Sequence, residues 1–146
     1  MGFLLRVLVE EIRVQKKIPL YEPPIASTAF EPEAFFCKNC IFFSYLRDEV
    51  QYKSGIKFHN VKEYEYHSES ICELWHIEDV YDNLVEILPS KKVAKIHKST
   101  LDYQIKRSES WHLKHYMIYL EGGCFEIIAE SWEILIEEEG VWSFPS

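Results

Sequence analysis

The chain has 146 residues, with 24 Asp or Glu against 16 Lys or Arg, so its formal net charge is -8 at pH 7. A chain of this length can bury a core of its own, and we expect residues 1–146 to form a single domain. The negative charge argues against nucleic acid as a partner, because phosphate binding requires clustered Lys and Arg.

The N-terminal segment carries no recognisable targeting signal. Phe3, Leu4 and Leu5 are followed directly by Arg6, so this apolar run is too short for a signal sequence or a membrane span. The four cysteines are too few for a disulfide scaffold, and such thiols are common in reduced compartments. We therefore expect a cytoplasmic protein with no membrane partner, whose cysteines are free or bound to a metal.

The first third of the chain predicts a strand followed by a loop. Residues 3–14 are rich in β-branched side chains, which favours a strand, although their spacing also fits a helix. Residues 19–32 hold four of the six prolines and predict a surface loop. Next, five aromatic residues surround a CxxC motif, and such a cluster must be buried in this domain or against a partner: Phe35, Phe36, Phe42, Phe43 and Tyr45.

The middle of the chain predicts short strands and two helices. Turns at residues 47–49 and 53–55 would bracket a strand at 50–52, followed by strands at 56–67 and 71–77. Apolar residues at helical spacing predict a helix over residues 77–88, with a hairpin turning at Asp82-Asn83 as the rival interpretation. Ser90 is a candidate cap for a second helix carrying Val93 and Ile96, and residues 100–105 predict another strand.

Residues 112–137 predict the central β-hairpin of the fold. Residues 116–120 alternate as a strand, and Glu121-Gly122-Gly123 supplies a turn that tolerates positive φ. On the return strand the apolar parity changes near Glu130-Ser131, which predicts a β-bulge or a strand break. Apolar residues on both faces indicate a sheet covered on both sides. Either a helix covers one face and a partner the other, or both faces lie in the protein's own core.

One cysteine motif has spacing suited to a metal. Cys37 and Cys40 can turn around one Zn²⁺, and Cys72 and His76 would complete a Cys₃His set. If residues 72–76 are extended, however, Cys72 and His76 lie about 13 Å apart, too far for one ion. We therefore expect buried structural cysteines and no cofactor, with zinc as the alternative.

Other polar residues give weaker signals. His112 and His115 would share a face on a helix but point to opposite faces of a strand, where they are structural rather than ligands. Glu126 and Glu130 share a strand face, and glutamates on such a face are usually solvated. The alternative is that they line a cleft beside His115 or Tyr119. No nucleophile elbow, P-loop or GxGxxG motif is present in the sequence.

These observations predict an α+β domain with one mainly antiparallel, twisted sheet of about five to seven strands and one or two helices. For function, the composition favours a non-catalytic protein-binding module of the inhibitor or immunity kind. Its expected partner is a protein with a basic surface, recognised by an acidic edge at Glu133, Glu137 and Glu138. The alternatives are a small-molecule-binding or enzymatic domain, with or without zinc, and a homodimer.

Overall fold

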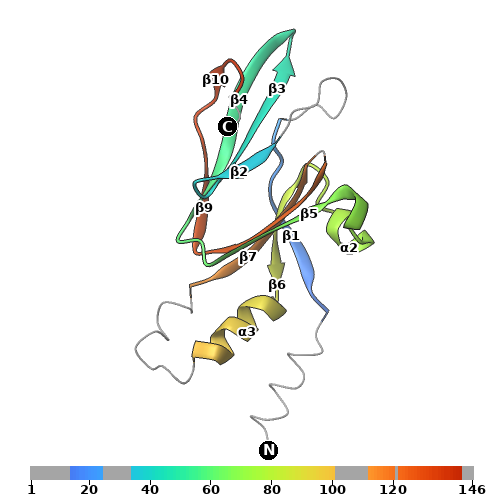
Figure 1. Ribbon diagram of the computed structural model, residues 1–146, viewed down its shortest axis with the longest axis vertical. Helices are drawn as coiled ribbons and strands as arrows, with labels where there is room; N and C mark the ends of the chain where they lie inside the picture. Colours follow the sequence, from blue (N-terminus) through green and yellow to red (C-terminus); the bar gives the residue numbers. More distant parts are fainter. Residues whose placement is uncertain (1–13, 25–33, 101–111, 121, 143–146) are drawn as a thin grey trace, which may run out of the picture.

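The computed structural model describes residues 14–24, 34–100, 112–120 and 122–142, and within them the chain forms two antiparallel sheets (Figure 1). The first sheet has the strand order β1-β6-β7-β8-β5, with bounds Lys16–Tyr21, Leu84–Leu88, Lys114–Leu120, Gly123–Ala129 and Glu63–Ser68. The second sheet consists of β2 (Phe35–Cys37), β3 (Cys40–Arg47), β4 (Val50–His59), β9 (Ser131–Ile134) and β10 (Glu138–Glu139).

Among the described residues, three helical elements accompany the sheets: η1 (Glu69–Ile71), α2 (Leu74–Ile77) and α3 (Lys91–Thr100). Figure 1 shows α2 beside β5 and α3 below the first sheet. Trp75 and Ile77 of α2 pack on Met117 and Tyr119, and α3 packs on Ile128. Both helices therefore cover one face of the first sheet. None of the helices in the described part of the chain has the length and apolar composition needed to cross a membrane.

The opposite face of the first sheet packs against the second sheet. Because residues alternate along a strand, Tyr116, Ile118 and Leu120 face the second sheet while Met117 and Tyr119 face the helices. The main core lies between the two sheets, and its buried members are Ile41, Phe43, Tyr45, Ile56, Phe58, Leu84, Tyr116, Ile118, Leu120, Phe125, Ile127 and Ala129. The β7–β8 hairpin is thus buried on both faces by the chain itself.

The coarse prediction of an α+β domain with mainly antiparallel strands is confirmed, but the strands belong to two sheets rather than one. The division occurs after Ala129, where β8 ends in the first sheet and β9 begins at Ser131 in the second. This is the position at which the apolar parity changes in the sequence. The parity changes because the chain passes from one sheet to the other.

The helix predicted over residues 77–88 is wrong. Within residues 77–88 only Ile77 is helical, as the last residue of α2, and Leu84–Leu88 forms β6, an interior strand of the first sheet. Val85 and Ile87 are buried facing the helices, while Leu84 is buried facing the second sheet. A strand with apolar residues on both faces produces a pattern that cannot be distinguished from helical spacing over so few residues.

Several other boundaries also differ from the prediction. β1 includes Pro19, which an edge strand tolerates, so the predicted loop at 19–32 is extended in its first three residues. β4 runs through the turn predicted at 53–55 and ends before Asn60, which has φ 54°. Residues 71–77 form parts of η1 and α2 instead of a strand. The predictions for residues 3–13, 25–32 and 101–105 lie outside the described residues.

We expect Gly55→Ala to destabilise the fold by about 1–3 kcal/mol, the range for overpacking. An added Cβ would lie 2.6 Å from the carbonyl oxygen of Ile41 and 2.9 Å from Cδ1 of Leu135, and the carbonyl belongs to the paired strand β3. Urea denaturation measures the effect. Gln51→Ala, at an exposed position of the same strand, is the control and should leave the unfolding midpoint unchanged.

Candidate functional site

The carboxylate of Glu126 lies buried in the apolar face that the helices cover. Alternation along β8 puts Cys124, Glu126 and Ile128 on this face, and Glu126 is only 6% exposed. A carboxylate removed from water is costly unless charged or hydrogen-bonding partners compensate it. The arrangement around Glu126 supplies those partners.

Three basic side chains from three elements contact the Glu126 carboxylate. His115 Nε2 of β7 lies 2.6 Å from Oε1, and His67 Nε2 of β5 lies 2.8 Å from Oε2. Lys92 Nζ of α3 lies 3.0 Å from Oε1 and 2.8 Å from Oε2 of Glu65. We call Glu126, His67, His115 and Lys92 the Glu126 cluster. It ties two strands and a helix to the middle of β8.

The cluster holds Glu126 in its ionised form. Burial alone would raise the pKa of Glu126, but the hydrogen bonds from His115, His67 and Lys92 outweigh burial and hold this pKa well below its usual range. Burial likewise opposes the charge on Lys92, yet its contacts with Glu65 and Glu126 raise the pKa of Lys92 above its ordinary value. The buried carboxylate is therefore neutralised by neighbouring cationic or hydrogen-bonding groups, not by protonation.

His76 of α2 extends the cluster toward solvent. Its ring stacks on that of His67 with the centroids 4.2 Å apart, and its Nδ1 accepts a hydrogen bond from Glu73 N. Burial, followed by the adjacent His67, lowers the pKa of His76, which favours a neutral imidazole. One nitrogen or oxygen atom from each of His67, His76 and Glu126 lies within 4.8 Å of the others, and this is a metal-ligating group among the described residues.

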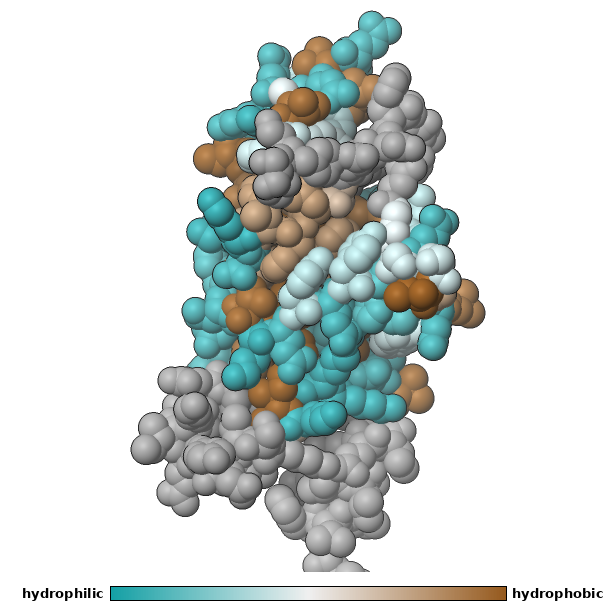
Figure 2. All heavy atoms as spheres, in the orientation of Figure 1, coloured by the Kyte–Doolittle hydropathy of each residue, from teal (hydrophilic) through white to brown (hydrophobic). Residues whose placement is uncertain are grey.

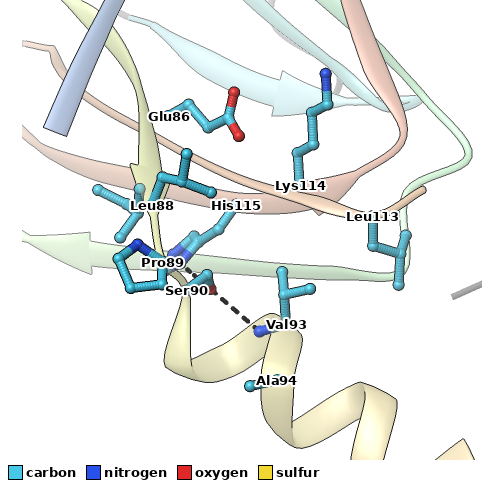
Figure 3. Close-up of a pocket in the computed structure, with 10 residues that line it drawn as sticks. Glu86, Leu88, Pro89, Ser90, Val93, Ala94, Leu113, Lys114 and His115 are labelled. Carbon is cyan, nitrogen blue, oxygen red and sulfur yellow. Dashed lines mark hydrogen bonds between the residues drawn. The ribbon is translucent and has the colours of Figure 1, made fainter. Parts of the chain in front are cut away.

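A pocket of about 180 Å³ opens on the other side of His115. Figure 3 shows Ser90 and His115 in its wall together with the apolar side chains of Leu88, Pro89, Val93, Ala94 and Leu113. Ser90 Oγ lies 2.8 Å from His115 Nδ1 and accepts a hydrogen bond from Val93 N, so it caps α3 as the sequence predicts.

A hydrogen-bonded chain therefore runs from Ser90 through His115 to Glu126. Because ionised Glu126 is only an acceptor, His115 Nε2 is the donor in their bond. If the ring is neutral, Nδ1 is then free to accept the proton of the Ser90 hydroxyl. This is the order of nucleophile, base and carboxylate used in acyl transfer.

The predicted zinc ligands are not brought together by the fold. Cys37 and Cys40 flank a two-residue turn of the second sheet, in which Lys38 and Asn39 have the positive φ angles of a type I′ hairpin. Cys72 Sγ instead donates to the carbonyl oxygen of His67, on the first sheet. Within the part of the chain that the structure describes, neither Cys37 nor Cys40 joins a group of three metal-ligating side chains.

The predicted acidic edge lies on the second sheet, and each of its glutamates has a basic neighbour. Glu137 pairs with Arg47 at 2.6 Å, Glu133 lies 3.3 Å from His59, and Glu138 lies 3.9 Å from Lys53. Ile134 and Ile136 beside them are exposed. The edge is thus acidic in sequence, but in the folded chain neighbouring basic side chains partly compensate its negative charge.

Sequence reasoning found part of the site. The solvated face expected for Glu126 is wrong, since this residue is buried, and the alternative position beside His115 matches the 2.6 Å contact. Glu130 bonds to Asn60 instead. His112 lies exposed before β7, apart from this contact. The roles of His67 and Lys92 were missed, since they come from segments about 60 and 30 residues away and carry no spacing signal.

Comparison with known proteins gave no relative: no family model, curated protein or solved structure matches the chain.

We expect Glu126→Gln to lower the stability of the protein at pH 7 by about 3 kcal/mol, since a buried charge network is broken. The pKa of Glu126 is lower in the folded chain than its ordinary value of about 4.3, so its stabilisation is present above that value and falls as pH drops. The difference between wild type and variant should shrink by about 1.4 kcal/mol per pH unit below it.

Urea denaturation at pH 3 to 7 measures this difference. Glu63→Gln, at an exposed position of β5, is the matched control and should parallel the wild type at every pH. A difference between wild type and Glu126→Gln that stays constant with pH would show that folding does not lower the pKa of Glu126, and wild-type stability that rises relative to the variant as pH falls would show that folding raises this pKa.

Proposed function

We propose that this protein is a non-catalytic protein-binding module, inhibitor-like or immunity-like and acting in the cytoplasm, that docks a partner with a basic surface. The observation that carries the proposal is an exposed apolar surface bordered by acids. Four large side chains protrude there, with exposed fractions of 45%, 64%, 73% and 50% for Tyr66, Ile71, Leu74 and Tyr81. We call them, with Glu69, Glu73 and Glu78, the tip surface.

The tip surface gathers around the turn of the β7–β8 hairpin. Glu69 N and the Tyr66 hydroxyl both donate to the carbonyl oxygen of Gly122, and the Tyr81 ring stacks on Tyr119 at 5.4 Å. Leu74 follows on α2, which packs against β7. At the right-hand side of Figure 2, where α2 lies in Figure 1, strongly hydrophobic side chains stand beside hydrophilic ones.

The charge of this segment supports a basic partner. Residues 63–81 contain six Asp or Glu and no Lys or Arg. By contrast, the glutamates of the edge at Glu133, Glu137 and Glu138 have basic neighbours within the chain. Within residues 63–81, Glu65 pairs with Lys92 and Lys17 contacts the backbone of Glu78, but no Lys or Arg of the described residues pairs with Glu69 or Glu73. Carboxylates without a paired cation steer a cationic partner more strongly and give up fewer existing contacts on docking. A second copy of this chain is a poorer occupant, because it would oppose like charges.

The apolar members provide the affinity. Burying an exposed Leu or Ile side chain contributes about 1.5–3 kcal/mol, and Tyr is favoured in interfaces because it offers a large ring at low entropic cost. Ile71 and Leu74 are therefore the expected anchors, with the surrounding glutamates setting orientation and association rate.

We expect the triple change Glu69→Lys, Glu73→Lys and Glu78→Lys to weaken binding of the partner at least about 100-fold, because several charge contacts of about 1 kcal/mol each are reversed. The partner is first captured from cells that make the protein and identified by mass spectrometry. Its dissociation constant is then measured with purified proteins at two salt concentrations.

The matched control is the triple change Glu133→Lys, Glu137→Lys and Glu138→Lys, which alters the net charge equally but on the second sheet. A loss confined to the first triple supports the tip surface. A loss confined to the second triple would return the site to the edge predicted from the sequence. Equal losses, or a partner without a basic surface, would contradict site-specific docking.

One observation favours a second candidate function, hydrolysis of a small ester or amide. The chain from Ser90 through His115 to Glu126 borders a pocket with apolar walls, and its carboxylate is buried and ionised. Ser90 would attack the acyl carbon while its proton passes to His115 Nδ1, which then protonates the leaving group. Water would release the acyl group in the second half of the reaction.

If this function holds, a fluorophosphonate should label the protein at Ser90. The Ser90 oxygen would bond to phosphorus as fluoride leaves, and the protein mass would rise by one adduct. Ser90→Ala should abolish the adduct, and the exposed Ser131→Ala should retain it. An unlabelled wild-type protein would leave Ser90 with its capping role alone.

A further inference from the structure

Around Glu126, side chains that commonly bind metals lie close enough together to hold one ion, and in this structure they are joined by hydrogen bonds. His67 Nε2 and Glu126 Oε2 are 2.8 Å apart, and a nitrogen of His76 lies within 4.8 Å of both ligand atoms. Ligand atoms of a tetrahedral zinc ion lie about 3.3 Å apart, given bonds of about 2.0–2.1 Å. Small side-chain shifts would therefore bring all three atoms to bonding distance.

We propose that His67, His76 and Glu126 bind one divalent transition-metal ion, with zinc the best fit, between β5, β8 and α2. Two imidazoles and one carboxylate are a known zinc donor set that leaves a fourth position for water or another ligand. Exposed Glu65 lies close to the proposed ligands, with its Oε2 3.3 Å from His67 Nε2, and could fill that fourth position. This site goes beyond the proposed docking function and does not depend on it.

The two oxygens of Glu126 are suited to separate tasks. Oε1 is held by His115, which is itself held by Ser90, while Oε2 faces His67. A ligating carboxylate fixed through its other oxygen is the usual arrangement of an outer shell around a metal. Metal binding would replace the proton between His67 and Oε2 and leave the contact with His115 intact.

The position of His76 also fits ligation. Its ring stacks on that of His67 with the centroids 4.2 Å apart, and metals bind the neutral imidazole. Its Nδ1 accepts from Glu73 N, so coordination through Nε2 requires a proton on Nδ1 and loss of that one hydrogen bond. His67 is 20% exposed at its side chain and Glu65 is 56% exposed, which leaves a route from solvent.

Lys92 is the competitor for this site. Its ammonium bridges Glu126 Oε1 and Glu65 Oε2, as a cation would, and it lies at the end of a flexible stem on α3. A purely structural cluster requires Lys92 to balance the charge of the carboxylates. A metal site gains affinity when Lys92 is removed, since two carboxylates are then left without their cation.

The test is zinc and cobalt titration of the full chain after chelator treatment, followed by native mass spectrometry and Co²⁺ absorption. We expect one ion per chain. His76→Ala should weaken metal binding by about 10- to 100-fold or more, because removing a direct ligand costs no less affinity than removing a residue that only orients a ligand. Lys92→Met should tighten binding. Circular dichroism establishes that each variant is folded.

Two controls distinguish this site from its rivals. The double change Cys37→Ser and Cys40→Ser, and His59→Ala on the second sheet, should leave zinc affinity unchanged, and the Co²⁺ spectrum should lack thiolate charge-transfer bands. Absence of bound zinc at neutral pH, zinc lost with the cysteines, or weaker binding in Lys92→Met would each overturn the proposal. These outcomes are read from metal binding, and none of them decides whether a partner binds the tip surface.

Discussion

The burial of the Glu126 carboxylate is the constraint on which the helix-covered side of the first sheet depends. An ionised carboxylate at 6% exposure is tolerable only while its partners remain in place, so β5, β7 and α3 must each present a basic side chain to one point on β8. The backbone pairing of β5 and β7 with β8 sets the register that brings His67 and His115 to Glu126. The cluster adds to this register, because a slipped strand would leave the buried carboxylate without these partners.

The two faces of the β7–β8 hairpin have different requirements. The face toward the second sheet is wholly apolar and tolerates adjustment of side-chain shape, with Tyr116 and Phe58 at a centroid distance of 5.6 Å. The other face combines apolar patches under α2 and α3 with the polar cluster between them. The short helices α2 and α3 leave the middle of this face without apolar cover. The Glu126 cluster occupies that part of the sheet, where each polar group has a partner.

The sequence predicted those features that depend on neighbouring residues. The turn near Gly122, the capping role of Ser90 and the parity change at Glu130 are local signals, and each has a counterpart in the structure. The helix at 77–88 failed because a strand buried on both faces has no periodicity of its own. The Glu126 cluster was only partly predictable, since the side chains that neutralise it come from β5 and α3 and meet only through the order of strands in the sheet.

The position of α2 links the buried cluster to the exposed tip surface. A helix of four residues has no stability of its own in water, so anchors must hold it. Trp75 and Ile77 pack on the sheet, Lys17 donates to the carbonyl oxygens of Trp75 and Glu78, and His76 stacks on His67. Leu74 is presented to solvent only while these anchors hold. Any ion that joins His76 to His67 and Glu126 would order α2 further and reduce the entropy lost when a partner docks on Leu74. By reciprocity, a docked partner would raise the affinity for the ion by the same factor, so binding at the two sites would be coupled through α2.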